Sequence, residues 1–285
     1  MNVYLLQIVN GIGLGMLYFL LAVGLSIVFG LLRFVNFAHG AFYLLGAYLA
    51  YQLVHWGVNF WLALIVAPLA IGAVAWLLEK ILLRHVYDHP HEFHILITVG
   101  LALVVQEVVI LIWGPIGDNV DIPTALQGVV IWGSFIYPKY RLFVIGFTAV
   151  FALALWWILE GTRIGSAVRA GSESTETVSL LGINVFRILS LVFALGAATA
   201  ALAGVLAAPI RGVDPFMGLE ALSVAFVIVV VGGMGSFGGA LVGGLLIGII
   251  QSVMSSLWPQ GAQLMIYVAM AAVLLLRPHG LMGRG

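Results

Sequence analysis

EGTRIGSAVRAGSESTETVSLLGINVFR, residues Glu160 to Arg187, is a polar stretch between two long apolar runs. After Glu160 it carries five more of the chain's charged residues: Arg163, Arg169, Glu173, Glu176 and Arg187. The pattern predicts two short helices, 163–170 and 173–181, divided by Gly171-Ser172, each with one apolar side. Gly182 stands where a left-handed residue would end the second helix.

This polar stretch has two interpretations, and its residues alone leave both open. A chain this apolar needs no polar loop of such length merely to turn around, so the stretch could be a docking platform for a water-soluble partner. It could equally be an amphipathic helix lying at the membrane interface.

The composition of the whole chain predicts a membrane protein. Of 285 residues, 63% are hydrophobic and 8% charged, whereas about a quarter of a soluble domain is charged. Basic and acidic residues number 11 each, which offers no case for nucleic-acid binding. Cysteine is absent, which excludes disulfides, thiolate catalysis and thiolate metal sites. We therefore expect an all-α, polytopic bundle of membrane helices.

Nine apolar segments follow one another along a single membrane domain, residues 1–285. They are 1–32, 41–53, 62–83, 95–113, 142–159, 188–210, 222–231, the run ending at Leu257, and 263–276. The run 222–231 is short enough to be a half-helix, so we expect eight or nine membrane segments, some of them broken. Two loops are large: 114–140, which contains a β-like segment GVVIWGSF, and 161–184.

The basic residues predict the orientation of the chain. With 161–184 in the cytoplasm and all nine segments crossing, eight of the 11 basic residues fall inside, as the positive-inside rule requires. Those inside are Arg33, Lys80, Arg84, Arg163, Arg169, Arg187, Arg277 and Arg284, and those outside are Lys139, Arg141 and Arg211. The C-terminus is then cytoplasmic and loop 114–140 lies outside.

Two glycine-containing breaks interrupt the apolar pattern. Asn36, His39 and Gly40 lie in FVNFAHGAFYLLGAY, and GGMGSFGG holds Gly232, Gly233, Gly235 and Ser236. Broken backbone at membrane depth survives only where it is buried in protein or lines a wet cavity. We therefore expect both breaks near a translocation path, although a simple surface turn would also explain the first. Further glycines spaced four apart, among them Gly244 and Gly248, predict close helix packing.

Candidate metal and ion-coupling residues are few. RHVYDHPHEFH gathers His85, His89, His91 and His94 with Asp88 and Glu92, side chains that could bind zinc or nickel. Pro90 and the irregular spacing match no structural zinc pattern, so we expect a solvated turn and no metal. Glu107 is the one carboxylate of a span that could couple transport to an ion.

Enzyme motifs are missing from the sequence. There is no Gly-Lys pair and hence no Walker A loop, no HExxH, and the nearest match to Gly-x-Ser-x-Gly, at 234–238, begins with Met234. We expect neither catalytic residues nor a cofactor. A secondary transporter, a channel and the permease half of an ATP-driven importer remain. A secondary transporter usually needs an ion-coupling group, and a channel needs a repeated filter motif or charged rings, which the sequence does not show. The permease half of an importer needs no catalytic residue of its own.

Four segments carry a family resemblance: FGLLRFVNFAHGAFYLLGAY, LLGINVFRI, VVGGMGSFGGALVGGLLIG and RPHGLMGR. Between about Gly24 and Arg284 the chain resembles the LivH-type permease subunits of branched-chain amino acid ABC importers. The resemblance implies a protein of the bacterial inner membrane. It also implies four kinds of partner: a homologous second permease, two ATPase subunits that bind the ATP, a periplasmic substrate-binding protein and an amino acid substrate.

The resemblance also implies that Glu173 to Gly182 contacts the ATPase and that transport proceeds by alternating access. Two features depart from the family pattern. Glu176 is followed by Thr177-Val178 where relatives usually show Glu-Ala-Ala, and the His-rich loop replaces an Arg-rich one. Related permeases carry urea or short amides, so these substrates stay open beside branched-chain amino acids, as does a secondary amino acid transporter.

Overall fold

The computed structural model describes residues 3–87, 89–132, 135–180, 182–283 of the chain. Its long helices are α1 (Val3–Leu32), α2 (His39–His55), α3 (Phe60–Ile81), α4 (His91–Trp113), α5 (Lys139–Gly161), α8 (Val185–Arg211), α9 (Met217–Gly232), α10 (Phe237–Leu257) and α11 (Ala262–Leu276). Its short elements are α6 (Arg163–Glu173), α7 (Thr175–Leu180), the 3-10 turns Leu83–Val86, Thr124–Leu126 and Pro259–Gly261, and strands β1 (Val129–Trp132) and β2 (Phe135–Pro138).

The nine long helices correspond to the nine apolar segments of the sequence. Among the described residues, seven of them are long and apolar enough to cross a membrane, and α2 and α9 are shorter, with 17 and 16 residues. The expected bundle with broken helices is therefore confirmed. Helix α9 begins at Met217, earlier than the apolar run starting at Leu222, and its first turn holds Glu220, which pairs with Arg211.

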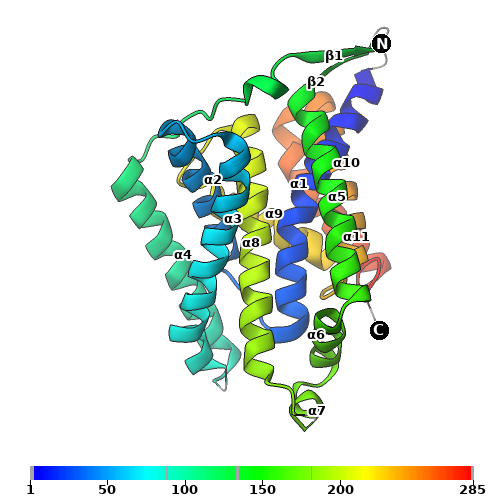
Figure 1. Ribbon diagram of the computed structural model, residues 1–285. Coiled ribbons are helices and arrows are strands. Elements are labelled where there is room, and N and C mark those ends of the chain that lie inside the picture. Colours follow the sequence, from blue (N-terminus) through cyan, green and yellow to red (C-terminus); the bar gives the residue numbers. More distant parts are fainter. Residues whose placement is uncertain (1–2, 88, 133–134, 181, 284–285) are drawn as a thin grey trace.

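Helices α1 and α8 form the centre of the bundle (Figure 1). Within their apolar windows 78% and 72% of the residues are buried, against 11% in α4 and 17% in α11. The outer helices therefore offer their apolar surface to lipid or to another subunit.

Small residues let the central helices approach closely. A Cβ added at Gly248 of α10 would lie 2.4 Å from the backbone nitrogen of Gly15 in α1, and one at Gly244 would lie 2.9 Å from the Gly15 carbonyl oxygen. Glycine at these positions removes the side chain that would hold the backbones apart. The packing role predicted for the spaced glycines is thus confirmed at this pair of helices.

The two ends of the bundle differ. The chain's start and the antiparallel hairpin β1–β2 lie at one end, whereas α6 and α7 project from the other (Figure 1). The hairpin confirms the β-like segment of loop 114–140. Backbone hydrogen bonds of 2.8 Å in both directions between Asp118 and Val213 tie this loop to the end of α8. Arg284, one of the basic residues assigned inside, lies outside the described residues.

Candidate functional site

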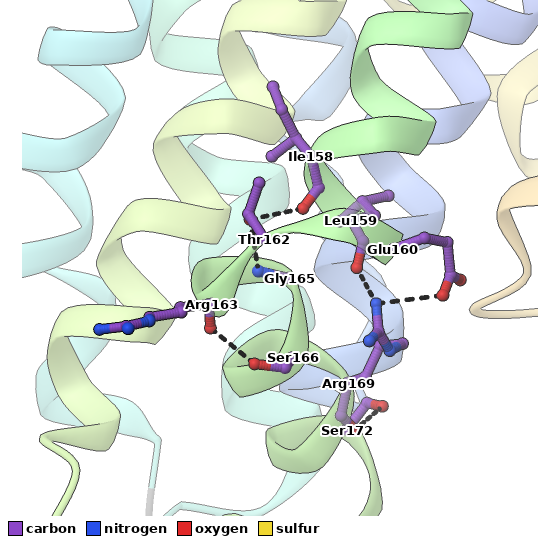
Figure 2. A network of polar contacts seen from close by, with 9 residues as sticks. All are labelled: Ile158, Leu159, Glu160, Thr162, Arg163, Gly165, Ser166, Arg169 and Ser172. Carbon is purple, nitrogen blue, oxygen red and sulfur yellow. Dashed lines mark hydrogen bonds and ion pairs between the residues drawn. The ribbon is translucent and has the colours of Figure 1, made fainter.

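Residues 163–183, hereafter the platform, form the polar region that projects from the bundle. Its first helix, α6, begins at a side-chain cap: the Thr162 hydroxyl accepts a hydrogen bond of 3.2 Å from the Gly165 backbone nitrogen and donates to the Ile158 carbonyl (Figure 2). Threonine suits this position because its oxygen satisfies a backbone donor that the first helical turn leaves unpaired. The start of the platform is therefore fixed to the end of α5.

Arg169 holds α6 against α5 a second time. Its guanidinium pairs with the Glu160 carboxylate at 3.2 Å and donates to the Leu159 carbonyl oxygen (Figure 2). Gly165 is buried at the crossing, and a Cβ there would lie 2.1 Å from the same carbonyl. Arg169 thus has an internal role, whereas the Arg163 side chain points away from this network and is exposed.

The boundary between the platform helices differs from the prediction. Helix α6 runs through Gly171 and Ser172 to Glu173, and the break falls at Ser174. Within this helix Gly171 is buried against the Leu31 side chain, where a Cβ would lie 2.8 Å from the Leu31 Cδ1. The guanidinium of Arg33 then donates to the carbonyls of Ser172 and Glu173, which end the helix.

The tip of the platform exposes apolar side chains. Leu180 is 82% exposed, whereas Val178 of the same helix is buried. Leu181 lies outside the described residues. Ile183 and Phe186 beside it are also exposed. Glu173 and Glu176 are exposed near this apolar tip. Gly182 has φ +78°, which confirms the predicted left-handed residue.

A cavity of about 520 Å³ separates the platform from the His-rich loop. Its lining includes His89, His91 and His94 from the loop and Glu173 and Glu176 from the platform. Among the described residues no group of three or more His, Asp or Glu side chains could hold a metal ion, and Asp88 lies outside them. The absence of a functional metal stays a prediction.

The first glycine-containing break is packed inside the protein. Asn36 and His39 are buried; the Asn36 amide oxygen accepts from the Ala38 nitrogen, and His39 Nε2 lies 2.9 Å from the Leu21 carbonyl oxygen. Gly40 meets Gly218 of α9 so closely that a Cβ would lie 2.1 Å from its carbonyl oxygen. The buried break is not a surface turn, and its place beside a translocation path stays a prediction.

The second break forms a joint between α9, α10 and the tail of the chain. The backbone nitrogens of Leu281 and Met282 donate to the carbonyls of Val231 and Gly232 at 2.8 and 2.9 Å. Gly233 and Gly235 have φ +105° and +78°. The Ser236 hydroxyl caps α10 by accepting from the Gly239 nitrogen at 3.0 Å. These residues form and stabilise the turn between α9 and α10. Their place beside a translocation path stays a prediction.

Glu79 of α3, which the sequence analysis did not single out, is a carboxylate buried inside the bundle. Glu79 is fully buried and accepts from the Tyr87 hydroxyl at 2.8 Å and the Ser190 hydroxyl at 2.5 Å. Burial, together with this carboxylate, raises the pKa of Tyr87, so its hydroxyl stays protonated and donates. Glu107, by contrast, is exposed on the outer helix α4.

A second cavity, of about 360 Å³, lies toward the hairpin end between α1, α5, α8 and α10; we call it the polar cavity. Its polar lining comprises Gln7, Asn10, Arg141, Arg211, Gln251, Ser252 and Ser255. Ligand pockets in proteins are commonly about 300–1,000 Å³, so a small molecule fits. Sequence reasoning missed it, and the available signal was four polar side chains, at 7, 10, 251 and 252, inside otherwise apolar runs.

Comparisons with known proteins agree on one family. Residues 7–276 match a family model described as "Branched-chain amino acid transport system / permease component". The permease protein LivH of the high-affinity branched-chain amino acid transport system of Salmonella typhimurium is 33% identical, over 99% of this chain and 96% of the relative. BraD of Pseudomonas aeruginosa, similarly named, is 32% identical over 99% and 96%. LivM of Salmonella typhimurium is 28% identical over 94% and 68%. No solved structure matches.

Proposed function

The chain belongs to the family of branched-chain amino acid transport permeases, and from that premise we propose that it is the membrane-spanning permease subunit of an ATP-driven importer for branched-chain amino acids. It would carry the substrate across the inner membrane by alternating access. Separate ATPase subunits would bind and hydrolyse the ATP, and a periplasmic binding protein would deliver the substrate to the hairpin end.

The observation that carries the coupling part of this proposal is the exposed apolar tip of the rigidly held platform. Leu180 and Ile183 of the platform are exposed at the projecting end of the bundle, together with Phe186 in the first turn of α8. An exposed apolar group rimmed by charge is typical of a protein–protein contact. Glu173 and Glu176 supply that charge. An interfacial helix would instead turn its apolar side toward the bilayer, parallel to the membrane surface.

A second permease is supported by the relatives. Salmonella typhimurium has two permease proteins, LivH and LivM, that both resemble this chain over nearly its full length. Two homologous permeases in one transport system would pair around a shared path. The largely exposed apolar helices α4, α5 and α11 are the surfaces that such a pairing and the lipid would cover.

The substrate class is tested by competition. The complete importer, with its ATPase subunits, second permease and binding protein, is placed in membrane vesicles and supplied with ATP and labelled leucine. We expect isoleucine and valine, and not urea or acetamide, to compete for uptake. Competition by urea or acetamide alone, without leucine uptake, would replace the amino acid with a short amide.

A further inference from the structure

We infer that the polar cavity is a binding site for the zwitterionic head of a free amino acid, with Arg211 and Arg141 holding its carboxylate and Glu220 its ammonium group. The inference rests on the proposed function and adds to it the place where substrate is recognised inside the membrane domain. None of these residues belongs to either glycine-containing break.

The charges around the cavity suit a zwitterion. Arg141 and Arg211 line it, and Glu220 stands against Arg211. One carboxylate for two guanidinium groups leaves an excess of one positive charge, which favours an anionic group in the cavity. A guanidinium presents five N–H donors in a planar fork that matches a carboxylate.

The ion pair of Arg211 with Glu220 is loose enough to open for a ligand. Its Nη2–Oε1 distance is 3.9 Å, well beyond the 2.7–2.9 Å of a tight charge-assisted hydrogen bond. The two side chains remain 40% and 47% exposed. When this ion pair opens, the ligand's carboxylate would pair with Arg211 and its ammonium with Glu220, so neither protein charge would be left unpaired.

Neutral donors and acceptors on the cavity wall are already oriented. The Tyr18 hydroxyl donates to the Gln251 amide oxygen, which leaves the Gln251 NH₂ as a donor for a ligand. The Ser252 hydroxyl donates to Gln7, and the Asn10 oxygen accepts from Arg141 at 2.7 Å. Side chains fixed in this way lose little conformational freedom when a ligand binds.

An apolar pocket continues behind Arg211 and suits an aliphatic side chain. It shares Arg211 with the polar cavity, and its walls include Leu14, Leu17, Leu21 and Val224. The pocket measures only about 20 Å³, which is room for about one water molecule, so it must widen to admit a branched side chain. Charged groups at the mouth of an apolar pocket distinguish an amino acid from urea, which has neither charge nor side chain.

The inference is tested on the purified importer in lipid nanodiscs, without the binding protein. Labelled leucine is displaced by leucine, by leucinamide, which lacks the carboxylate, or by 4-methylpentanoate, which lacks the ammonium. We expect Arg211→Gln to weaken leucine binding about 10- to 100-fold, the effect of losing a hydrogen bond to a charged group, and to reduce the preference over leucinamide, with Arg141 still present. Glu220→Gln should instead abolish the preference over 4-methylpentanoate.

Lys139→Gln is the matched control. Lys139 is a positive charge in the first turn of α5, as Arg141 is, but Lys139 does not line the polar cavity. It should leave all three affinities unchanged. Should Arg211→Gln fail to assemble, Arg211→Lys keeps the charge but not the fork, and we expect a smaller loss in the same direction.

Unchanged leucine affinity and unchanged ligand preference in both Arg211→Gln and Glu220→Gln would overturn the inference. The absence of saturable leucine binding to an importer that takes up leucine would also overturn it. An equal fall of all three affinities in each variant would also overturn it, because a merely structural ion pair does not discriminate between analogues. Failure of the wild-type importer to take up leucine at all would instead contradict the proposed function.

Discussion

The guanidinium of Arg33 donates a hydrogen bond of 3.0 Å to the carbonyl oxygen of Glu173, 140 residues further along the chain. This bond joins the end of α1 to the end of α6. Helix α1 then runs through the centre of the bundle to Asn10 and Gln7 at the polar cavity. With 30 residues it is about 45 Å long. A displacement of the platform could therefore be transmitted to the polar cavity through this one continuous helix.

Arg33 is therefore expected to couple ATP hydrolysis to transport. Arg33→Gly removes both hydrogen bonds to the platform. Arg33 has φ +57°, and glycine adopts this positive φ without steric strain, so the backbone should not change. We expect normal assembly with the ATPase and a severalfold lower ratio of leucine transported to ATP hydrolysed, consistent with about 1 kcal/mol for such bonds. An unchanged ratio of leucine transported to ATP hydrolysed in the reconstituted importer would show that this contact does not couple the ATPase to transport.

Gly182 is expected to be the most sensitive position of the platform. A Cβ there meets no atom within 4 Å, so a substitution is opposed by the backbone and not by space. At φ +78°, Gly182→Val should cost about 1–3 kcal/mol and tilt the exposed tip. Insertion and pairing with the second permease should stay normal, whereas ATPase co-purification or coupled uptake should fall.

Gly182→Asn is the matched control, because asparagine adopts the left-handed conformation with little strain. It should retain most activity. Glu176→Lys should act like Gly182→Val but more weakly, through charge reversal on the exposed face of the platform. Wild-type uptake in Gly182→Val and Glu176→Lys at equal membrane levels would mean that the stretch is only an interfacial helix.

The fold was largely predictable from the sequence, because each membrane helix is a continuous apolar segment that can be recognised from its own residues. Each apolar segment corresponds to one helix, and Gly182 was identified by its place after an apolar turn. The break between the platform helices was misplaced because Gly171 looks like a helix end, whereas it is packed inside α6 against Leu31 of α1, a tertiary contact that the local sequence does not reveal.

The polar cavity could not be predicted, because its residues come from four helices far apart in the chain. Asn10 and Arg141, whose side chains meet at 2.7 Å, are separated by 131 residues. Arg211 and Arg141 sit near helix ends, where basic residues are ordinary anchors at the membrane surface. Only the packing of α1, α5, α8 and α10 brings them to one space.

Glu79 is expected to stabilise the packing of α3 against α8. Replacing it with alanine leaves the partly buried Tyr87 hydroxyl without its acceptor and removes one of the two acceptors of the Ser190 hydroxyl, which also donates to the Phe186 carbonyl oxygen. We expect Glu79→Ala to reduce the stability of the purified importer by on the order of 2 kcal/mol, seen as a lower Tm. Glu107→Ala, which removes an exposed carboxylate, should leave the Tm unchanged. Equal Tm values for both variants would contradict the role given to Glu79.

Gly248 is expected to be essential for the contact of α1 with α10. In Gly248→Ala the new methyl group would lie 2.4 Å from the Gly15 nitrogen, a distance that forces the helices apart. Folded yield should drop sharply. Gly100→Ala on α4, where a Cβ meets nothing within 4 Å, should have a wild-type yield, measured by size-exclusion chromatography in detergent. A normal yield of Gly248→Ala would contradict this packing.

ATP-dependent uptake in proteoliposomes tests the central claim most directly. One set of vesicles contains this chain alone, and a matched set contains it with the ATPase subunits, the second permease and the binding protein. We predict that only the second set accumulates leucine, and only with ATP on the side of the ATPase. Leucine accumulation by the chain alone, driven by an ion gradient, would contradict the account and identify a secondary transporter.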